Sequence, residues 1–342
     1  MNKKKEKQSD FLITGSAGFI GFSLSKFLLD KGKNVIGLDN LNNYYDVNLK
    51  KSRLKILNKY ENFNFKKIDI EEKEKINNLF SNHKPEKVIH LAAQAGVRYS
   101  IQNPEIYLKS NINGFFYLLE ASRKNNVSHF IYASTSSVYG ENTQNSFKED
   151  HNTDHPIQFY AATKKANEVM AHSYSALYNL PTTGLRFFTV YGPWGRPDMA
   201  LFKFTKNILE NKPIEIFNKG NHSRSFTYIE DLIKSIYKIS LEPAKADKKW
   251  NQKKPNSSSS KYPYQILNIG SNSSIKLMYL ISIIEKKLEK KAIKNYLPLQ
   301  RGDIKNTKSN TEKLKRAIKI SPNTPIEKGV EKFIDWFIEF YK

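Results

Sequence analysis

Residues 11–21 read FLITGSAGFIG, and this segment indicates the fold class of the chain. Its first three residues are an apolar run that predicts a buried strand, and apolar side chains at helical spacing follow the glycines. A strand, a glycine-rich turn and a helix in this order bind the pyrophosphate of a dinucleotide. Gly15 permits the tight turn, Gly18 lets the backbone approach the phosphates, and Gly21 lets helix and strand pack closely. The free N–H groups of Phe19 and Ile20 complete the predicted phosphate site.

The second predicted strand, residues 35–38, ends at an acid, Asp39. The glycines follow GxxGxxG rather than GxGxxG, so without this acid an ordinary glycine turn would be the better interpretation. Asp39 follows Gly18 at the expected distance of about 20 residues. A carboxylate here can accept hydrogen bonds from the adenosine ribose and would repel a 2′-phosphate, which favours NAD over NADP.

Tyr160 and Lys164 lie four residues apart on a predicted helix, residues 160–177, so their side chains share one face. A phenol with the usual pKa of about 10 is a poor base at neutral pH. A nearby ammonium group favours the phenolate, and so would the positive charge of an oxidised nicotinamide. A tyrosine of lowered pKa can take a proton from a sugar hydroxyl while a hydride leaves the same carbon. The spacing alone is common on solvated helices, and the glycine turn favours the catalytic interpretation.

Small or polar residues follow the other predicted strands, at residues 64–68, 87–91 and 129–133. Open α/β sheets bind ligands at the carboxyl ends of their strands, so one shared site is expected. The predicted fold class is α/β, with a Rossmann-type doubly wound parallel sheet and a smaller mixed α/β C-terminal substrate lobe. The expected cofactor-binding residues are Gly15, Gly18, Phe19, Ile20, Gly21, Asp39, Asn40, Asp69, Ile70, Ala92, Ala93, Gln94, Tyr160 and Lys164.

The chain has 342 residues and no cysteine, with 56 Lys and Arg against 33 Asp and Glu, a formal net charge of +23. There is therefore no disulfide framework or thiolate metal site, and no other metal-ligand spacing occurs. The lysines are scattered, which predicts a solvated surface that attracts anionic substrates, and no nucleic-acid partner. The start is polar and no apolar run could span a bilayer, so no membrane partner and a cytoplasmic location are expected.

The chain divides into segments of different character. Residues 1–10 are a polar tail, and residues 11–185 form the predicted NAD-binding Rossmann domain with the Tyr160 helix. Residues 186–342 form mainly the substrate lobe, with some segments returning to the Rossmann domain. Within them, residues 244–262 are of low complexity and are expected to form a flexible surface loop.

Several of these motifs in combination resemble the extended short-chain dehydrogenases/reductases. They are the glycine turn, Asp39, residues 69–70 (DI), residues 90–93 (HLAA), the Ser/Thr cluster at 134–137 and Tyr160-xxx-Lys164. A closer resemblance is to the UDP-glucuronate 4-epimerases, which include the CapI-like enzymes of capsule synthesis. It rests on residues 39–46 (DNLNNYYD), 92–100 (AAQAGVRYS) and 186–198 (RFFTVYGPWGRPD), and it extends from residue 11 to 341 except for the 244–262 loop.

This resemblance implies an isomerase with bound NAD and a UDP-sugar substrate. It implies that Tyr160 is the base and acid on the sugar O4, that Lys164 binds the nicotinamide ribose and lowers the pKa of Tyr160, and that Thr135 bridges Tyr160 and the substrate oxygen. The expected substrate-binding residues are Arg98, Ser136, Ser137, Thr189, Arg196, Arg224 and Arg301. A homodimer is also implied, with packed helices whose apolar face includes Ala166, Val169, Met170 and Leu177.

The residues that follow Thr135 help to distinguish among the reactions of this superfamily. Dehydratases of this superfamily usually have Asp-Glu there and decarboxylases a Glu in the cluster, whereas this chain has Ser136 and Ser137. Many relatives that act on neutral hexoses have Asn in place of Thr189. The resemblance therefore favours C4 epimerisation of UDP-glucuronate to UDP-galacturonate. The alternatives are a 4-epimerase of UDP-glucose or a UDP-N-acetylhexosamine, a UDP-glucuronate decarboxylase, and a catalytically silent NAD-binding protein.

The chain departs from the family pattern at two places. Relatives usually read RDFTYIDD where this chain has residues 224–231 (RSFTYIED), so Ser225 replaces an acid beside Arg224. They often have QPGD where this chain has residues 300–303 (QRGD), and Arg301 either reaches the nucleotide or faces solvent. Arg98 either contacts the substrate or pairs with an acid.

Overall fold

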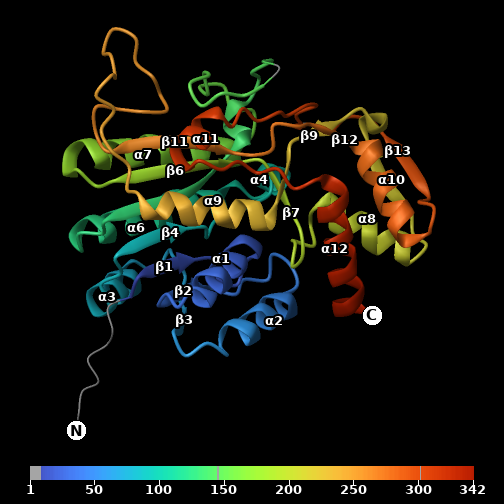
Figure 1. The fold of residues 1–342 in the computed structure, drawn as a ribbon, viewed down its shortest axis with the longest axis horizontal. Coiled ribbons are helices and arrows are strands. Elements are labelled where there is room, and N and C mark those ends of the chain that lie inside the picture. The colour runs from blue at the N-terminus through green and yellow to red at the C-terminus, as the bar shows by residue number, and fades with distance from the viewer. Residues whose placement is uncertain (1–8, 145, 301) are drawn as a thin grey trace.

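The computed structural model describes residues 9–144, 146–300 and 302–342, and a parallel β-sheet forms its centre (Figure 1). Within these residues the sheet has seven strands, in the order β11-β6-β5-β4-β1-β2-β3. This order confirms the predicted Rossmann-type sheet. The strands are β1 Phe11–Thr14, β2 Val35–Asp39, β3 Phe63–Lys67, β4 Lys87–His90, β5 His129–Thr135, β6 Thr182–Phe187 and β11 Tyr264–Ile269.

Helices cover both faces of the sheet (Figure 1). One face carries α1 Phe19–Asp30, α2 Val47–Leu57, α9 Ile229–Leu241 and α11 Glu312–Ile318. The other carries α3 Lys73–His83, α6 Phe115–Lys124 and α7 Phe159–Tyr178. Shorter elements connect them: α4 Tyr99–Gln102, α5 Pro104–Tyr107, the π-helix η1 Leu108–Gly114 and the 3-10 turn η2 Ser136–Tyr139.

Each face of the sheet has its own hydrophobic core. Along β1, Phe11 and Ile13 belong to the core under α1, whereas Leu12 belongs to the core under α3 and α6. Successive side chains of a strand point to opposite faces, so a strand covered on both faces is apolar throughout. The first core continues into the C-terminal lobe through Phe202 and Phe333.

The C-terminal lobe lies beside the sheet and includes three small strand pairs (Figure 1). The pairs are β7 Thr189–Tyr191 with β10 Phe226–Tyr228, β8 Ile214–Phe217 with β13 Lys294–Leu297, and β9 Ser223–Arg224 with β12 Ile275–Lys276. The helices are α8 Ala200–Leu209, the 3-10 turn η3 Asn218–Gly220, α10 Leu277–Leu288 and α12 Ile326–Tyr341. The expected boundary at residues 185/186 falls inside β6, and the chain leaves the sheet after Phe187.

The low-complexity segment 244–262 extends from the sheet edge near β11 (Figure 1), and its second half is anchored. Ser258 and Ser260 are buried, and Lys313 donates hydrogen bonds to the carbonyl and hydroxyl oxygens of Ser258, at 2.6 and 2.8 Å. His172 on α7 contacts the hydroxyl of Ser260 at 2.9 Å. Among the described residues, no helix is long and apolar enough to cross a membrane.

Candidate active site

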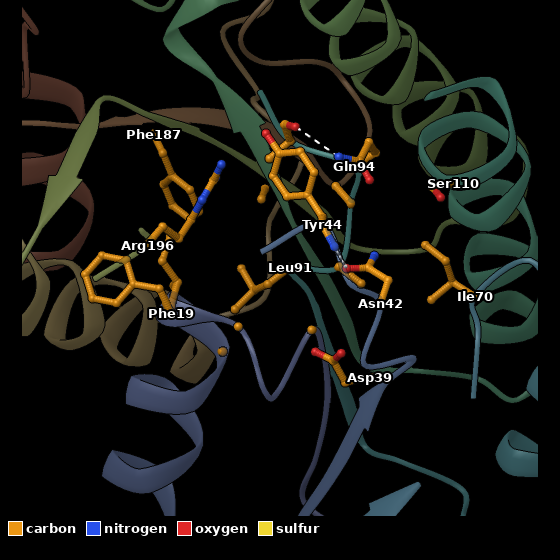
Figure 2. Close-up of a pocket in the computed structure, with 18 of the residues that line it drawn as sticks. Phe19, Asp39, Asn42, Tyr44, Ile70, Leu91, Gln94, Ser110, Phe187 and Arg196 are labelled. Atoms are coloured by element: carbon orange, nitrogen blue, oxygen red, sulfur yellow. Dashed lines mark hydrogen bonds between the residues drawn. The ribbon is translucent and has the colours of Figure 1, made fainter. Parts of the chain in front are cut away.

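A cavity opens at the carboxyl ends of the central strands, where most of the predicted cofactor-binding residues meet (Figure 2). In this view Asp39, Asn42 and Ile70 lie at one end, and Phe19, Phe187 and Arg196 lie at the other. Thr135 also lines the cavity. The predicted cofactor-binding residues line it as well, except Asp69, whose carboxylate instead accepts a hydrogen bond from the Asn40 amide at 2.7 Å.

The glycine turn has the geometry that its sequence predicts. Gly15 has φ +73°, a left-handed conformation that glycine adopts without a steric penalty. A Cβ on Gly18 would lie 3.0 Å from the carbonyl oxygen of Gly15, and one on Gly21 would collide with the same atom. The α1 helix begins at Phe19 without a side-chain cap, so its first N–H groups are available to a phosphate.

Asp39 fixes the turn as well as offering acceptors to a ribose. One of its carboxylate oxygens accepts from the backbone N–H of Ala17 at 3.1 Å, and the other accepts from that of Leu41 at 2.9 Å. Each carboxylate oxygen can accept a second hydrogen bond. Asp39 can therefore hold the turn and bind ribose hydroxyls at the same time.

Asn111, on the π-helix η1, fixes the backbone of Gln94, which lines the cavity. Its side-chain oxygen accepts from the backbone N–H of Gln94 at 2.9 Å, and its amide donates to the carbonyl of Gln94 and to the hydroxyl of Thr163, both at 3.1 Å. Short π-helical segments occur frequently at functional sites. The sequence does not predict this residue, because no motif marks the π-helix.

Tyr160 and Lys164 project from the first turns of α7 into the cavity, beside Thr135 at the end of β5. Burial raises the pKa of Tyr160, while the Arg196 guanidinium and the hydroxyl of Thr135 act in the opposite direction. Burial lowers the pKa of Lys164 to about 8. Lys164 is not among the groups that shift the pKa of Tyr160 in the protein without cofactor, so its implied effect on this pKa stays a prediction.

Arg196 is the predicted substrate residue that lines the cavity. Its guanidinium makes two hydrogen bonds to the Asp198 carboxylate, at 2.5 and 3.0 Å. Although burial opposes it, the nearby Asp198 charge raises the pKa of Arg196. The guanidinium thus remains a permanent cation at the cavity end where Figure 2 shows Phe19 and Phe187.

Ser136, Ser137 and Thr189 are half-buried next to the cavity lining. Within residues 9–144, 146–300 and 302–342, none of their hydroxyl groups has a hydrogen-bond partner. The backbone N–H of Ser137 donates to the Thr135 hydroxyl at 3.1 Å, which orients the start of η2. These hydroxyls can donate hydrogen bonds to a ligand without breaking any existing one.

The structure gives internal partners to Arg98 and Arg224, and neither lines the cavity. Arg98 pairs with Asp303 at 3.1 Å and lies over the ring of Phe217. Arg224 donates to the carbonyl oxygens of Ser223 and Lys305, at 3.0 and 2.7 Å.

The two departures from the family pattern differ in what the structure shows. Ser225 is buried, and its hydroxyl donates to the carbonyl of Ser271 at 2.7 Å and accepts from the N–H of the same residue at 3.0 Å. These two hydrogen bonds join the residue that precedes β10 to Ser271. Arg301 lies outside the described residues.

Lys50 lines the cavity and was not predicted. This buried side chain of α2 donates to the carbonyl and side-chain oxygens of Asn42, at 2.8 and 2.7 Å. Burial lowers its pKa, and the nearby Asp39 charge opposes this shift. In a lysine-rich chain nothing in the sequence separates this lysine from the exposed ones.

The cavity suits a dinucleotide with a nicotinamide ring. Gly15, Gly18 and Gly21 line the cavity with backbone alone, and Asp39 offers free lone pairs at one end. The Lys164 ammonium has no hydrogen-bond partner among the described residues, although the side chain is 2 % exposed. A ligand in the cavity can therefore accept hydrogen bonds from this ammonium. The described residues hold no group of three or more His, Asp or Glu side chains that could bind a metal ion.

The sheet order, the glycine turn and the Tyr160-xxx-Lys164 pair define a class of protein, and the comparison with known families agrees. Residues 11–252 match the NAD dependent epimerase/dehydratase family, and the chain belongs to it.

Individual relatives match the chain over nearly its full length. It is 54% identical to Protein CapI of Staphylococcus aureus over 331 residues, 97% of this chain and 99% of CapI. It is 42% identical to a probable UDP-glucuronate 4-epimerase of Rhizobium meliloti over 97% of this chain and 98% of that protein. The crystal structure of UDP-glucuronic acid 4-epimerase from Bacillus cereus, in complex with UDP-glucuronic acid and NAD, superposes with a TM-score of 0.86. In that comparison the identity is 33%, over 97% of this chain and 99% of the other.

Proposed function

We propose that this protein is an NAD-dependent UDP-glucuronate 4-epimerase, which interconverts UDP-glucuronate and UDP-galacturonate. The observation that carries the proposal is the cavity itself, where Thr135, Tyr160 and Lys164 meet the dinucleotide turn and the adjoining hydroxyls are unpaired. The similarity to relatives with this activity supports the same conclusion.

The residues of the cavity have separate tasks in this reaction. When bound, NAD supplies a reversible acceptor for the hydride of C4. The turn at Gly15 and the start of α1 hold its phosphates, while Asp39 holds the adenosine ribose and Lys164 the nicotinamide ribose. Tyr160 removes the proton of the 4-hydroxyl through the Thr135 hydroxyl and later returns it, so one proton-transfer group serves both directions.

The two residues that follow Thr135 are neither strong acids nor strong bases, which favours epimerisation over elimination. Elimination of the 6-substituent needs an acid and a base, and Ser136 and Ser137 provide neither. After oxidation the sugar must turn so that C4 receives the hydride on its other face.

The substrate carboxylate must be held during that step. A 4-keto uronate is a β-keto acid that tends to lose carbon dioxide, so a free carboxylate would lead to decarboxylation. The unpaired hydroxyls of Ser136, Ser137 and Thr189 are suited to hold it. For the UDP phosphates we propose Arg196, which lines the cavity, and Arg224, which would exchange its bonds to Ser223 and Lys305 for the phosphates. Arg98, which would leave Asp303, and Arg301 are proposed as further cations of the substrate site.

A parallel assay with three substrates tests the proposed function. Purified protein is incubated with UDP-glucuronate, UDP-glucose and UDP-N-acetylglucosamine, and the products are resolved chromatographically. We expect UDP-galacturonate as the main product, with the highest kcat/KM for UDP-glucuronate. UDP-xylose as the main product would indicate a decarboxylase. A preference for either neutral sugar would indicate the alternative epimerase, and no turnover would indicate a silent NAD-binding protein.

We also propose a homodimer in the cytoplasm. Val169 and Leu177 on α7 are 59% and 69% exposed, and Phe116 on the adjacent α6 is 40% exposed. Exposed apolar side chains on neighbouring helices are typical of an interface. Met170 instead packs against the core and does not contribute fully to this face. Light scattering at micromolar concentration is expected to give twice the chain mass, and a monomeric mass would contradict the dimer.

A further inference from the structure

Arg53, on α2, is completely buried but has no acidic partner. Its side chain is 0% exposed, and within residues 9–144, 146–300 and 302–342 it forms no ion pair. Arg186 provides the comparison, because it is equally buried and makes two hydrogen bonds to the Glu168 carboxylate, both at 2.9 Å. Burying a charge without a counter-ion is costly, so the site of Arg53 requires a specific explanation.

The hydrogen bonds of Arg53 join two parts of the active site. One terminal nitrogen donates to the carbonyl of Ala17 at 2.8 Å and to the hydroxyl of Tyr45 at 2.9 Å. The other donates to the carbonyl of Trp194 at 2.6 Å, 141 residues further along the chain. The Nε atom is buried and has no partner.

Ala17 belongs to the glycine turn, and both of its backbone polar groups are hydrogen-bonded to charged side chains. Its N–H donates to the Asp39 carboxylate at 3.1 Å, while its carbonyl accepts from Arg53. The position of the turn toward a pyrophosphate therefore depends on both charged side chains. The positive charge of Arg53 lies next to the place where the phosphates bind, without a carboxylate to cancel it.

Trp194 belongs to the loop that carries Arg196 into the cavity, and its backbone is strained. Its φ is +65°, in the left-handed region that bulky residues avoid. Its ring packs against Phe22 of α1 at 5.2 Å and against Trp336 and Phe340 of α12 at 5.3 and 5.0 Å. Strained residues persist where the surroundings fix them, and they cluster at active sites.

We propose that Arg53 is a positioning residue that ties the cofactor-binding glycine turn to the Trp194 loop, and that through this loop it sets Arg196 at the substrate site. A guanidinium suits this task because its fork donates in two directions at once, which a lysine ammonium on a single atom does not reproduce. The inference concerning Arg196 rests on the proposed UDP-sugar function, whereas that concerning the glycine turn rests on the dinucleotide site alone.

Two binding measurements test the two ends of this link. NAD affinity is measured by titration into protein freed of nucleotide. UDP-glucuronate affinity is measured calorimetrically with saturating NAD, in the non-reacting Tyr160→Phe background. Arg53→Met is expected to weaken both affinities at least tenfold. Arg53→Lys keeps the charge but not the fork, so it is expected to retain NAD affinity within about threefold and to lose affinity for UDP-glucuronate.

Two control variants separate positioning from charge and from stability. Arg123→Met removes one positive charge at a site outside the cavity, and Leu79→Ala weakens the core under α3. Both are expected to bind each ligand within twofold of the wild type. If Arg53→Met fails to fold, the proposal is tested by the two affinities of Arg53→Lys alone.

Either of two outcomes would overturn the proposal. In the first, Arg53→Met binds both NAD and UDP-glucuronate with affinities within twofold of the wild type. If Arg53→Met does not fold, the same result for Arg53→Lys overturns the proposal. The second is Leu79→Ala with the same losses as the Arg53 variants, because affinity would then only follow stability. Wild-type protein that binds NAD but not UDP-glucuronate would instead overturn the proposed function, and with it the inference about Arg196.

Discussion

The phenol of Tyr160 is held in an environment that keeps it protonated in the protein alone. Burial raises its pKa, and the opposing influence of Arg196 and Thr135 does not compensate for this. The positive ring of oxidised nicotinamide would act in the same direction as Arg196. We therefore expect the proton to be released most readily when both charges are present, which would link the proposed base to the oxidised state of the cofactor.

Removing the phenolic hydroxyl is expected to stop the reaction without unfolding the protein. Tyr160→Phe should reduce kcat by about 10²–10⁴-fold, the usual contribution of a proton-transfer group. Tyr178→Phe, at an exposed position on the same helix, is the matched control and should leave kcat unchanged. Product formation and circular dichroism are measured for each. Full activity of Tyr160→Phe would exclude this tyrosine as the base.

Lys164 predicts a pH dependence of NAD binding. Burial lowers its pKa to about 8, so the free protein loses the ammonium as the pH rises through that value. Ribose oxygens favour the ammonium and raise its pKa on binding, so binding takes up a proton above pH 8. NAD affinity should thus fall between pH 8 and about 10, by at most tenfold per unit. Titrations over this range should show a flat profile for Lys164→Met, and an equally steep profile would exclude Lys164.

Among the elements of the fold, α7 and β6 are joined by a charged pair on which the placement of the proposed catalytic residues depends. Arg186 on β6 binds Glu168 on α7, and Glu168 also accepts from the hydroxyl of Ser134 at 2.6 Å. Although burial opposes it, the Arg186 guanidinium keeps the pKa of Glu168 below its usual value. The pair sets α7, with Tyr160, against the end of β5, with Thr135.

Neutralising the Glu168 carboxylate is expected to destabilise the folded protein. Glu168→Gln leaves a buried guanidinium without its counter-ion and is expected to lower the free energy of unfolding by about 3–5 kcal/mol. Glu120→Gln breaks a solvent-accessible pair with Arg123 and should cost about 1 kcal/mol or less. Urea denaturation compares the two variants. Equal losses would show that the buried pair does not hold α7 in place.

The elements nearest the glycine turn could be predicted most fully from the sequence. Apolar runs mark the central strands, and the predicted helix at 160–177 differs from α7 by one residue at each end. The π-helix at Leu108–Gly114 could not be predicted, because its side chains follow no helical period that distinguishes it. Asn111 and its hold on Gln94 therefore became visible only in the structure.

At the scale of the whole molecule, the site is assembled from segments far apart in the chain. Local motifs predicted Asp39 and Lys164 because each lies within its own strand or helix pattern. The contact of Arg53 with Trp194 spans 141 residues. The unpaired hydroxyls of Ser136, Ser137 and Thr189 indicate a ligand site only because they lie next to the cavity. Such contacts depend on how the C-terminal lobe packs beside the sheet, which no local pattern records.

The net charge of +23 should steer the anionic substrate toward the cavity. We expect kcat/KM for UDP-glucuronate to fall by about tenfold as salt is raised from low ionic strength to about 0.5 M, because the Debye length falls below about 5 Å. The value of kcat should change little, since the bound substrate is shielded. Initial rates over a salt series provide the measurement. A kcat/KM independent of salt would leave the charge without a role in substrate capture.

In the proposed reaction C4 loses a hydride and regains the same hydride on its other face, without loss of the carboxylate. UDP-glucuronate labelled with deuterium at C4, followed by proton NMR during turnover, tests this most directly. We expect UDP-galacturonate that retains deuterium at C4. Loss of the deuterium to solvent, or UDP-xylose as the product, would contradict it.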